Sequence, residues 1–221
     1  MDQATKTPVY FVPGLAASSR IFEYISLPDQ YDKRLIEWLT PVSEDESIEA
    51  YAKRMAAQVE DPNSILVGVS FGGVMVQEMK AFLNPKKVII ISSVKCRNEM
   101  PRRMHFSQKT NIHKVFPNIT HDTIEKYEKY AFTDWGKHKI KLYKTYFSVR
   151  DKKYLPWSFH TIMNWKREKP DPEVIHIHGT SDGVFPYKYI DGCIEVPEGT
   201  HVMILNKAKK INQILNDVLN A

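Results

Sequence analysis

The stretch Ile65-Leu66-Val67-Gly68-Val69-Ser70-Phe71-Gly72-Gly73 decides the fold that we expect for this chain. A run of β-forming residues leads into Ser70, and the residues that follow give residues 71–83 an apolar helical face. A serine on a sharp strand-to-helix turn needs a strained backbone and close packing, so small residues are required two positions before and after it. Gly68 and Gly72 meet that requirement. The pattern therefore predicts a nucleophile elbow with Ser70 as the nucleophile.

Short apolar runs alternate with amphipathic segments along most of the chain. Strands are expected near residues 9–12, 34–38, 65–69, 88–91, 174–178 and 193–196, and helices over 47–59, 71–83 and about 204–218. The expected strands are almost wholly apolar, which is typical of a parallel sheet covered by helices on both faces. We therefore predict an α/β fold with a mostly parallel central sheet of about six strands, flanked by helices.

Residues 95–169 differ in composition from the rest of the chain. They hold 18 Lys and Arg against 7 Asp and Glu, a net charge of +11 in a chain whose total is +5, and more than half of the aromatic residues. No strand-like run occurs among them. We predict a helical cap or lid inserted into a core domain formed by residues 1–94 and 170–221, and lying over the carboxyl ends of the strands, where α/β proteins bind ligands.

The basic, aromatic insertion has several interpretations. Amphipathic helices with solvated lysines outside and aromatic rings inside would explain its composition. A second interpretation is a cap that attracts an anionic substrate. Peripheral membrane contact, giving access to lipid esters, is a third. Nucleic-acid binding is disfavoured because no recognisable nucleic-acid module accompanies the basic residues.

A serine nucleophile needs a general base within hydrogen-bond reach, and the base needs an orienting carboxylate. For this type of elbow the expected chain order is Ser, then Asp or Glu, then His. Asp182 lies in a turn after the strand expected at 174–178, and His201 follows the last expected strand. Because the carboxyl ends of parallel strands share one edge of the sheet, we expect Ser70, Asp182 and His201 to meet there.

Other residues compete for the acid and base roles. Asp191 is the nearest rival of Asp182, but it lies beyond the loop that leaves the strand. His176 and His178 are two residues apart on an expected strand, where roles in the core or in supporting the site are favoured. The remaining histidines, His105, His113, His121, His138 and His160, fall in the insertion.

Attack on a carbonyl creates an oxyanion, which needs preorganised hydrogen-bond donors. The backbone N–H of Phe71, directly after the nucleophile, is one expected donor. The second is expected from the loop after the first strand, where Val12-Pro13-Gly14-Leu15-Ala16 offers the N–H of Leu15.

The segments around Ser70, Asp182 and His201 resemble those of the α/β-hydrolase superfamily, particularly its small cofactor-free esterases, lyases and acyl hydrolases with a helical cap. The resemblance extends from Pro8 to Leu219 and leaves only the cap unassigned. It implies a catalytic triad of Ser70, Asp182 and His201, with Leu15 and Phe71 as oxyanion donors. One departure is Pro13-Gly14 after the first strand, where many members have His-Gly.

The expected activity is hydrolysis of a small-molecule carboxylic ester or thioester through an acyl-enzyme, with no cofactor, no metal and no nucleic-acid partner. Two alternatives stay open. The same triad can serve a lyase or C–C hydrolase, because a fold does not fix a reaction. A ligand-binding sensor that keeps a silent hydrolase site is the other.

The sequence also predicts a cytoplasmic protein. No apolar run approaches the roughly 18–20 residues that span a bilayer. Residues 1–6 lack the charged and apolar regions of a signal peptide. The two cysteines, Cys96 and Cys193, form no disulfide framework or metal cluster, which agrees with a reducing compartment.

Overall fold

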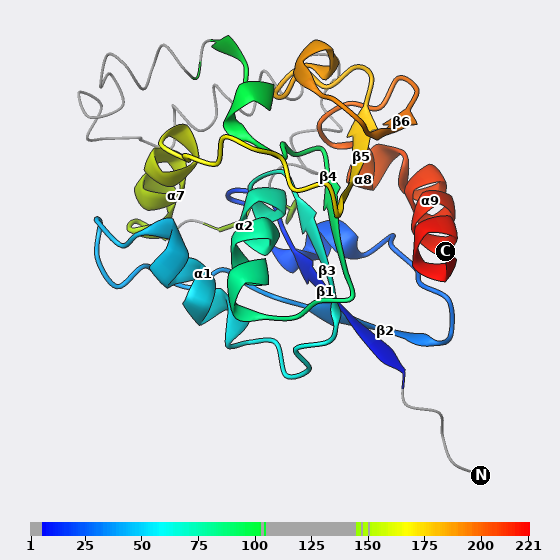
Figure 1. The fold of residues 1–221 in the computed structure, drawn as a ribbon, viewed down its shortest axis with the longest axis horizontal. Helices are drawn as coiled ribbons and strands as arrows, with labels where there is room; N and C mark the ends of the chain where they lie inside the picture. The colour runs from blue at the N-terminus through cyan, green and yellow to red at the C-terminus, as the bar shows by residue number, and fades with distance from the viewer. Residues whose placement is uncertain (1–5, 103, 105–144, 147, 150) are drawn as a thin grey trace.

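The computed structural model describes residues 6–102, 104, 145, 146, 148, 149 and 151–221. These residues build one six-stranded sheet in the order β2-β1-β3-β4-β5-β6, in which every neighbouring pair is parallel (Figure 1). The strands are β1 (Thr7–Val12), β2 (Tyr31–Leu35), β3 (Ile65–Val69), β4 (Lys87–Ile91), β5 (Val174–Gly179) and β6 (Ile194–Val196). The predicted α/β fold with a parallel sheet of about six strands is confirmed.

Helices cover both faces of this sheet. They are α1 (Ile48–Ala56), α2 (Phe71–Met79), α7 (Tyr154–Met163), α8 (Met203–Asn206) and α9 (Ala208–Asn220), with 3-10 turns η1 (Ser19–Phe22), η2 (Lys80–Phe82), η3 (Arg97–Glu99) and η4 (Tyr187–Tyr189). Figure 1 shows α1, α2 and α7 on one side of the sheet and α9 on the other. Along β1, Tyr10 and Val12 belong to the core under the first group, whereas Val9 and Phe11 belong to the core under α9.

The strand register aligns the ends that carry the candidate site residues. Val69, the last residue of β3, pairs with Ile91 of β4, and Ile91 pairs with Ile177 of β5. Gly179, the last residue of β5, pairs with Val196 at the end of β6. The turns that follow β3, β4, β5 and β6 therefore leave the sheet at one edge.

Four predicted elements differ from the structure by more than two residues. The helices expected at residues 47–59 and 71–83 end earlier, at Ala56 and Met79. The second strand was expected at residues 34–38 but covers Tyr31–Leu35. It is an edge strand that pairs with β1 alone, and its residues are partly exposed, so an apolar run did not mark it. The predicted last helix is divided into α8 and α9 at Lys207, whose backbone is not helical (φ −123°, ψ 24°).

The predicted insertion at residues 95–169 is described only in part. Its described residues include α7, which buries Leu155 and Trp157 in the core shared with α1 and α2. Residues 105–144, which make up most of the predicted cap, lie outside the described residues. In the part of the chain that the structure describes, no helix combines the length and apolarity needed to cross a membrane.

Candidate active site

Ser70 occupies the sharp turn between β3 and α2. Its backbone has φ 53° and ψ −119°, a region that non-glycine residues rarely adopt, and such strain is typical of functional turns. A Cβ atom at Gly68 would lie 2.2 Å from the Gly72 carbonyl oxygen, and one at Gly72 would lie 2.3 Å from the carbonyl oxygens of Val12 and Pro13. Both positions thus require glycine for the reason that the sequence pattern predicted.

Hydrogen bonds to the end of β4 and to the loop after it hold this strained turn. The Ser70 N–H donates to the Ile91 carbonyl oxygen at 2.9 Å, and the Ser93 hydroxyl donates to the Ser70 carbonyl oxygen at 2.7 Å. The main chain of Ser70 is therefore fixed on both sides, which leaves the side-chain hydroxyl free to point at its partner.

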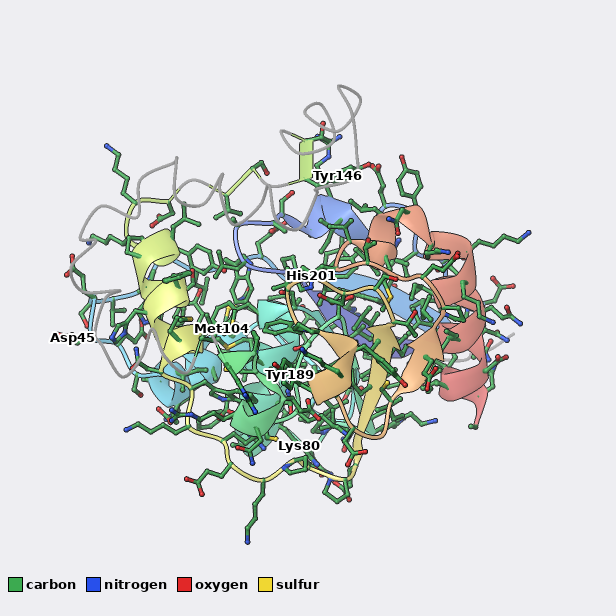
Figure 2. The ribbon with its side chains drawn as sticks, turned by 90° about the horizontal axis from the view of Figure 1, so that it is seen from above. Asp45, Lys80, Met104, Tyr146, Tyr189 and His201 are labelled. Carbon is green, nitrogen blue, oxygen red and sulfur yellow. The ribbon has the colours of Figure 1, made fainter. Side chains whose placement is uncertain are left out.

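The structure brings Ser70, Asp182 and His201 together. His201 Nε2 lies 2.9 Å from Ser70 Oγ, and His201 Nδ1 lies 2.9 Å from Asp182 Oδ2. An ionised carboxylate only accepts hydrogen bonds, so Nδ1 carries the imidazole proton and Nε2 presents a lone pair to the serine hydroxyl. Figure 2, seen from above, places His201 near the middle of the molecule.

Asp182 is held rigidly beneath His201. It is 4% exposed, and its second oxygen, Oδ1, accepts the backbone N–H groups of Val184 and Phe185 at 2.8 and 2.9 Å. The carboxylate therefore has three donors, and the turn after β5 orients it. The rival Asp191 is an exposed residue beyond η4.

Two buried histidines lie behind this carboxylate. His178 Nε2 is 2.9 Å from the Phe185 carbonyl oxygen and 3.8 Å from Asp182 Oδ2, and His178 Nδ1 is 3.1 Å from His176 Nε2. The carbonyl only accepts, so His178 donates from Nε2, and His176 donates to His178 Nδ1. This series of hydrogen bonds supports the turn of residues 182–185. It agrees with the core or supporting role that the sequence favoured for His176 and His178.

Burial sets the charge of both histidines. It lowers the pKa of His176 well below the ordinary 6.5, and the neighbouring His178 and Lys95 add to the effect. It also lowers the pKa of His178, against the opposing influence of Asp182 and of the Phe185 carbonyl. Both imidazoles are therefore neutral at pH 7, as the hydrogen-bond chain requires.

The loop after β1 approaches the nucleophile closely. A Cβ atom at Gly14 would lie 3.5 Å from Ser70 Cβ, an ordinary contact distance. Ala16, two residues on, has φ 61°, a left-handed conformation that alanine rarely adopts, and its carbonyl accepts the Val149 N–H at 3.1 Å. No hydrogen bond to another described residue engages the N–H of Leu15. The loop is thus built to bring the Gly14–Leu15 peptide beside Ser70.

One residue at this site was missed by the sequence reasoning. Trp38 was assigned to a strand, yet it lies in the loop after β2 and donates its indole N–H to the Gly14 carbonyl oxygen at 3.0 Å. No motif signals this contact, because the two residues are 24 positions apart.

Among the described residues, no group of three or more His, Cys, Asp or Glu side chains is arranged to hold a metal ion. Both cysteines are free thiols, Cys96 buried and Cys193 partly exposed. Burial raises the pKa of the Cys193 thiol, so this side chain stays protonated at neutral pH.

Comparison with known proteins identifies the fold. No protein-family model and no curated protein matches the chain. Among solved structures, an α/β-hydrolase fold protein from Burkholderia ambifaria is similar with a TM-score of 0.70 and 14% identity, covering 97% of this chain and 91% of its own. The chain therefore has the α/β-hydrolase fold, as the resemblance implied.

Two further neighbours carry different activities in their names. A thermophilic esterase from Thermogutta terrifontis has a TM-score of 0.67 and 12% identity, covering 98% of this chain and 90% of its own. An epoxide hydrolase from Bacillus megaterium has a TM-score of 0.66 and 13% identity, covering 100% and 96%. At these identities the likeness establishes a fold, and the reaction has to be argued from the site.

Proposed function

We propose that this protein is a serine hydrolase that cleaves a small-molecule carboxylic ester or thioester through an acyl-enzyme. The observation that carries the proposal is the unbroken hydrogen-bond relay from Asp182 through His201 to Ser70 Oγ, with both imidazole contacts at 2.9 Å. The relay ends on a strained turn that exposes the serine hydroxyl to a substrate. The same arrangement of acid, base and nucleophile carries out acyl transfer in serine hydrolases.

In the proposed reaction, Ser70 Oγ attacks the carbonyl carbon while His201 Nε2 accepts the hydroxyl proton. Asp182 stabilises the imidazolium that forms. The negative charge on the former carbonyl oxygen is stabilised by the N–H groups of Leu15 and Phe71. Collapse of the tetrahedral intermediate releases the alcohol or thiol, which takes the proton from His201. The same imidazole then activates water, and hydrolysis frees Ser70.

The direct test compares Ser70→Ala with wild type on 4-nitrophenyl acetate and in covalent labelling by a fluorophosphonate probe. We expect the variant to lose labelling entirely and turnover by a factor on the order of 10⁴ or more, as is typical when a serine nucleophile is removed. Ser43→Ala, at an exposed serine, is the matched control. Labelling that persists in Ser70→Ala would refute the proposal.

The other two activities predict different results in the same assay. A lyase or C–C hydrolase would keep the Ser70-dependent labelling but release no burst of 4-nitrophenol. A ligand sensor with a silent site would be stabilised by a bound ester without turning it over.

A further inference from the structure

The indole of Trp38 contacts the supports of both expected oxyanion donors. Its Nε1–H donates to the Gly14 carbonyl oxygen at 3.0 Å. Its ring stacks on the Phe71 ring, with centroids 5.3 Å apart and an interplanar angle of 24°. One side chain thus joins the loop after β1 to the first residue of α2.

The bond to Gly14 fixes the direction of the Leu15 N–H. The Gly14 carbonyl and the Leu15 N–H belong to the same peptide group, which is planar and trans, so the two bonds point in opposite directions. The Ala17 N–H also donates to the Gly14 oxygen, at 3.1 Å. Two donors on the carbonyl therefore lock the peptide plane and polarise its N–H, which makes that N–H a better donor.

The stacking contact acts on the second donor. Phe71 is the first residue of α2, so its N–H has no carbonyl one turn earlier within the helix. Its side chain is fully buried and is held on one face by Trp38 and at its edge by Trp157, whose centroid is 6.2 Å away. Because the ring is held in place, the backbone at the start of α2 is held too, and with it the direction of the Phe71 N–H.

We propose that Trp38 is a positioning residue for the oxyanion hole, and this inference rests on the proposed function. The indole N–H orients the Gly14–Leu15 peptide, and the indole face holds Phe71. The N–H groups of Leu15 and Phe71 thereby converge on the carbonyl oxygen of the substrate, and Trp38 itself touches no reacting atom.

A plain packing role is the competing explanation, because Trp38 also contacts the aromatic core. Its ring lies 5.2 Å from the Tyr154 ring and 6.4 Å from the Tyr51 ring. Packing alone requires an aromatic ring at position 38 but no N–H. Trp38→Phe separates the two roles, since it keeps a stacking ring and removes the hydrogen bond to Gly14.

The experiment measures kcat and KM of Trp38→Phe with 4-nitrophenyl acetate and with its thiono analogue, in which sulfur replaces the carbonyl oxygen. Sulfur is a longer and weaker hydrogen-bond acceptor, so the rate ratio of oxygen to sulfur substrate reports on the oxyanion donors. We expect kcat to fall about tenfold, less than the loss of a whole donor. KM should change little, and the oxygen-to-sulfur ratio should fall with kcat.

Trp165→Phe is the matched control. Trp165 is a buried tryptophan whose indole N–H donates to Glu78 Oε1 at 2.9 Å, and it lies outside the site. Its replacement should lower stability without changing the oxygen-to-sulfur ratio. If Trp38→Phe does not fold, the benzothienyl analogue of tryptophan at position 38, which carries sulfur in place of the N–H, provides the same comparison in the indole's shape.

The inference is overturned if Trp38→Phe and Trp165→Phe lower kcat equally. It is also overturned if the oxygen-to-sulfur rate ratio of Trp38→Phe equals that of wild type. Failure of the proposed function gives a different result, because wild type and Ser70→Ala would then have equal esterase activity. The two failures are therefore distinguishable.

Discussion

The two sides of Ser70 are organised in different ways. On the acid–base side, side chains contact one another directly, from Asp182 through His201 to the serine hydroxyl. On the oxyanion side, the candidate groups are main-chain amides, and the residues around them, Gly14 and Trp38, take no part in the chemistry that we propose. One side depends on which side chains are present, and the other on where the backbone lies.

This difference explains how substitutions should act. A changed side chain on the acid–base side removes a functional group, so the rate should fall while the fold survives. A change on the oxyanion side alters packing or peptide orientation, so rate and stability should fall together and by less. Both statements can be checked with single substitutions.

After the removal of Ser70 itself, the largest effect is expected for Asp182→Asn. The amide can present its NH₂ group to His201, which favours the tautomer with the proton on Nε2, and that nitrogen can then no longer accept the Ser70 proton. We expect kcat for 4-nitrophenyl acetate to fall by about 10⁴, with little change in the urea midpoint.

Asp191→Asn serves as the control, because Asp191 is exposed and was the rival candidate in the sequence. It should retain nearly full activity. If Asp191→Asn lost more activity than Asp182→Asn, our assignment of the acid residue would be wrong.

The sequence predicted the acid–base side well for a physical reason. Ser70, Asp182 and His201 each follow a strand closely, and parallel strands place all their exits at one edge of the sheet, so residue order and local pattern suffice to bring them together. The need for Gly68 was equally local, because a Cβ atom there would meet the turn's own backbone at Gly72, whereas a Cβ atom at Gly72 would meet the backbone at the end of β1.

The oxyanion side could be predicted only in part. Leu15 was inferred from its place in the loop after the first strand, and Phe71 from its place directly after the nucleophile. Trp38 was not, because its bond to Gly14 depends on how the chain leaves an edge strand whose polar residues lack an apolar pattern. For His176 and His178, alternation placed both side chains on one face, but the contact with the Phe185 carbonyl depends on the turn that follows.

A smaller effect is expected for Gly72→Ala, which tests the packing of the oxyanion side. The new Cβ would lie 2.3 Å from two backbone oxygens, those of Val12 and Pro13, and backbone atoms cannot rotate away. The resulting strain should exceed the roughly 1 kcal/mol that alanine gains over glycine inside a helix. We expect a net loss of about 2 kcal/mol in the free energy of unfolding, measured with urea, together with a lower kcat.

Gly14→Ala provides the comparison, since its Cβ would meet Ser70 Cβ at an ordinary 3.5 Å. Its stability should stay within about 0.5 kcal/mol of wild type. Equal stability losses in the two variants would show that the close approach of α2 to the end of β1 is not what makes Gly72 necessary.

The smallest effect concerns the support of the acid–base side by His176 and His178. Burial lowers the pKa of both in the folded state, so the unfolded chain binds more protons wherever the pH is below the ordinary 6.5. The contribution of the two neutral histidines to the free energy of unfolding is therefore fully present above about pH 6.5. It is lost as the pH falls, by up to about 1.4 kcal/mol per pH unit for each histidine.

His178→Gln isolates this contribution, because the glutamine amide can still donate to the Phe185 carbonyl but does not titrate. The groups facing His178 are Asp182, His201 and His176, and Lys95 acts on His176. Urea unfolding at pH 7.5 and 5.5 should show a smaller loss of stability on acidification for His178→Gln than for wild type. Because the buried carboxyl of Glu99, whose pKa burial raises, contributes with the opposite sign in both proteins, the comparison must be made between them. An equal loss of stability in the two proteins would mean that the fold does not hold His178 neutral. The acid–base side of Ser70 would then lack the support that we assign to His178.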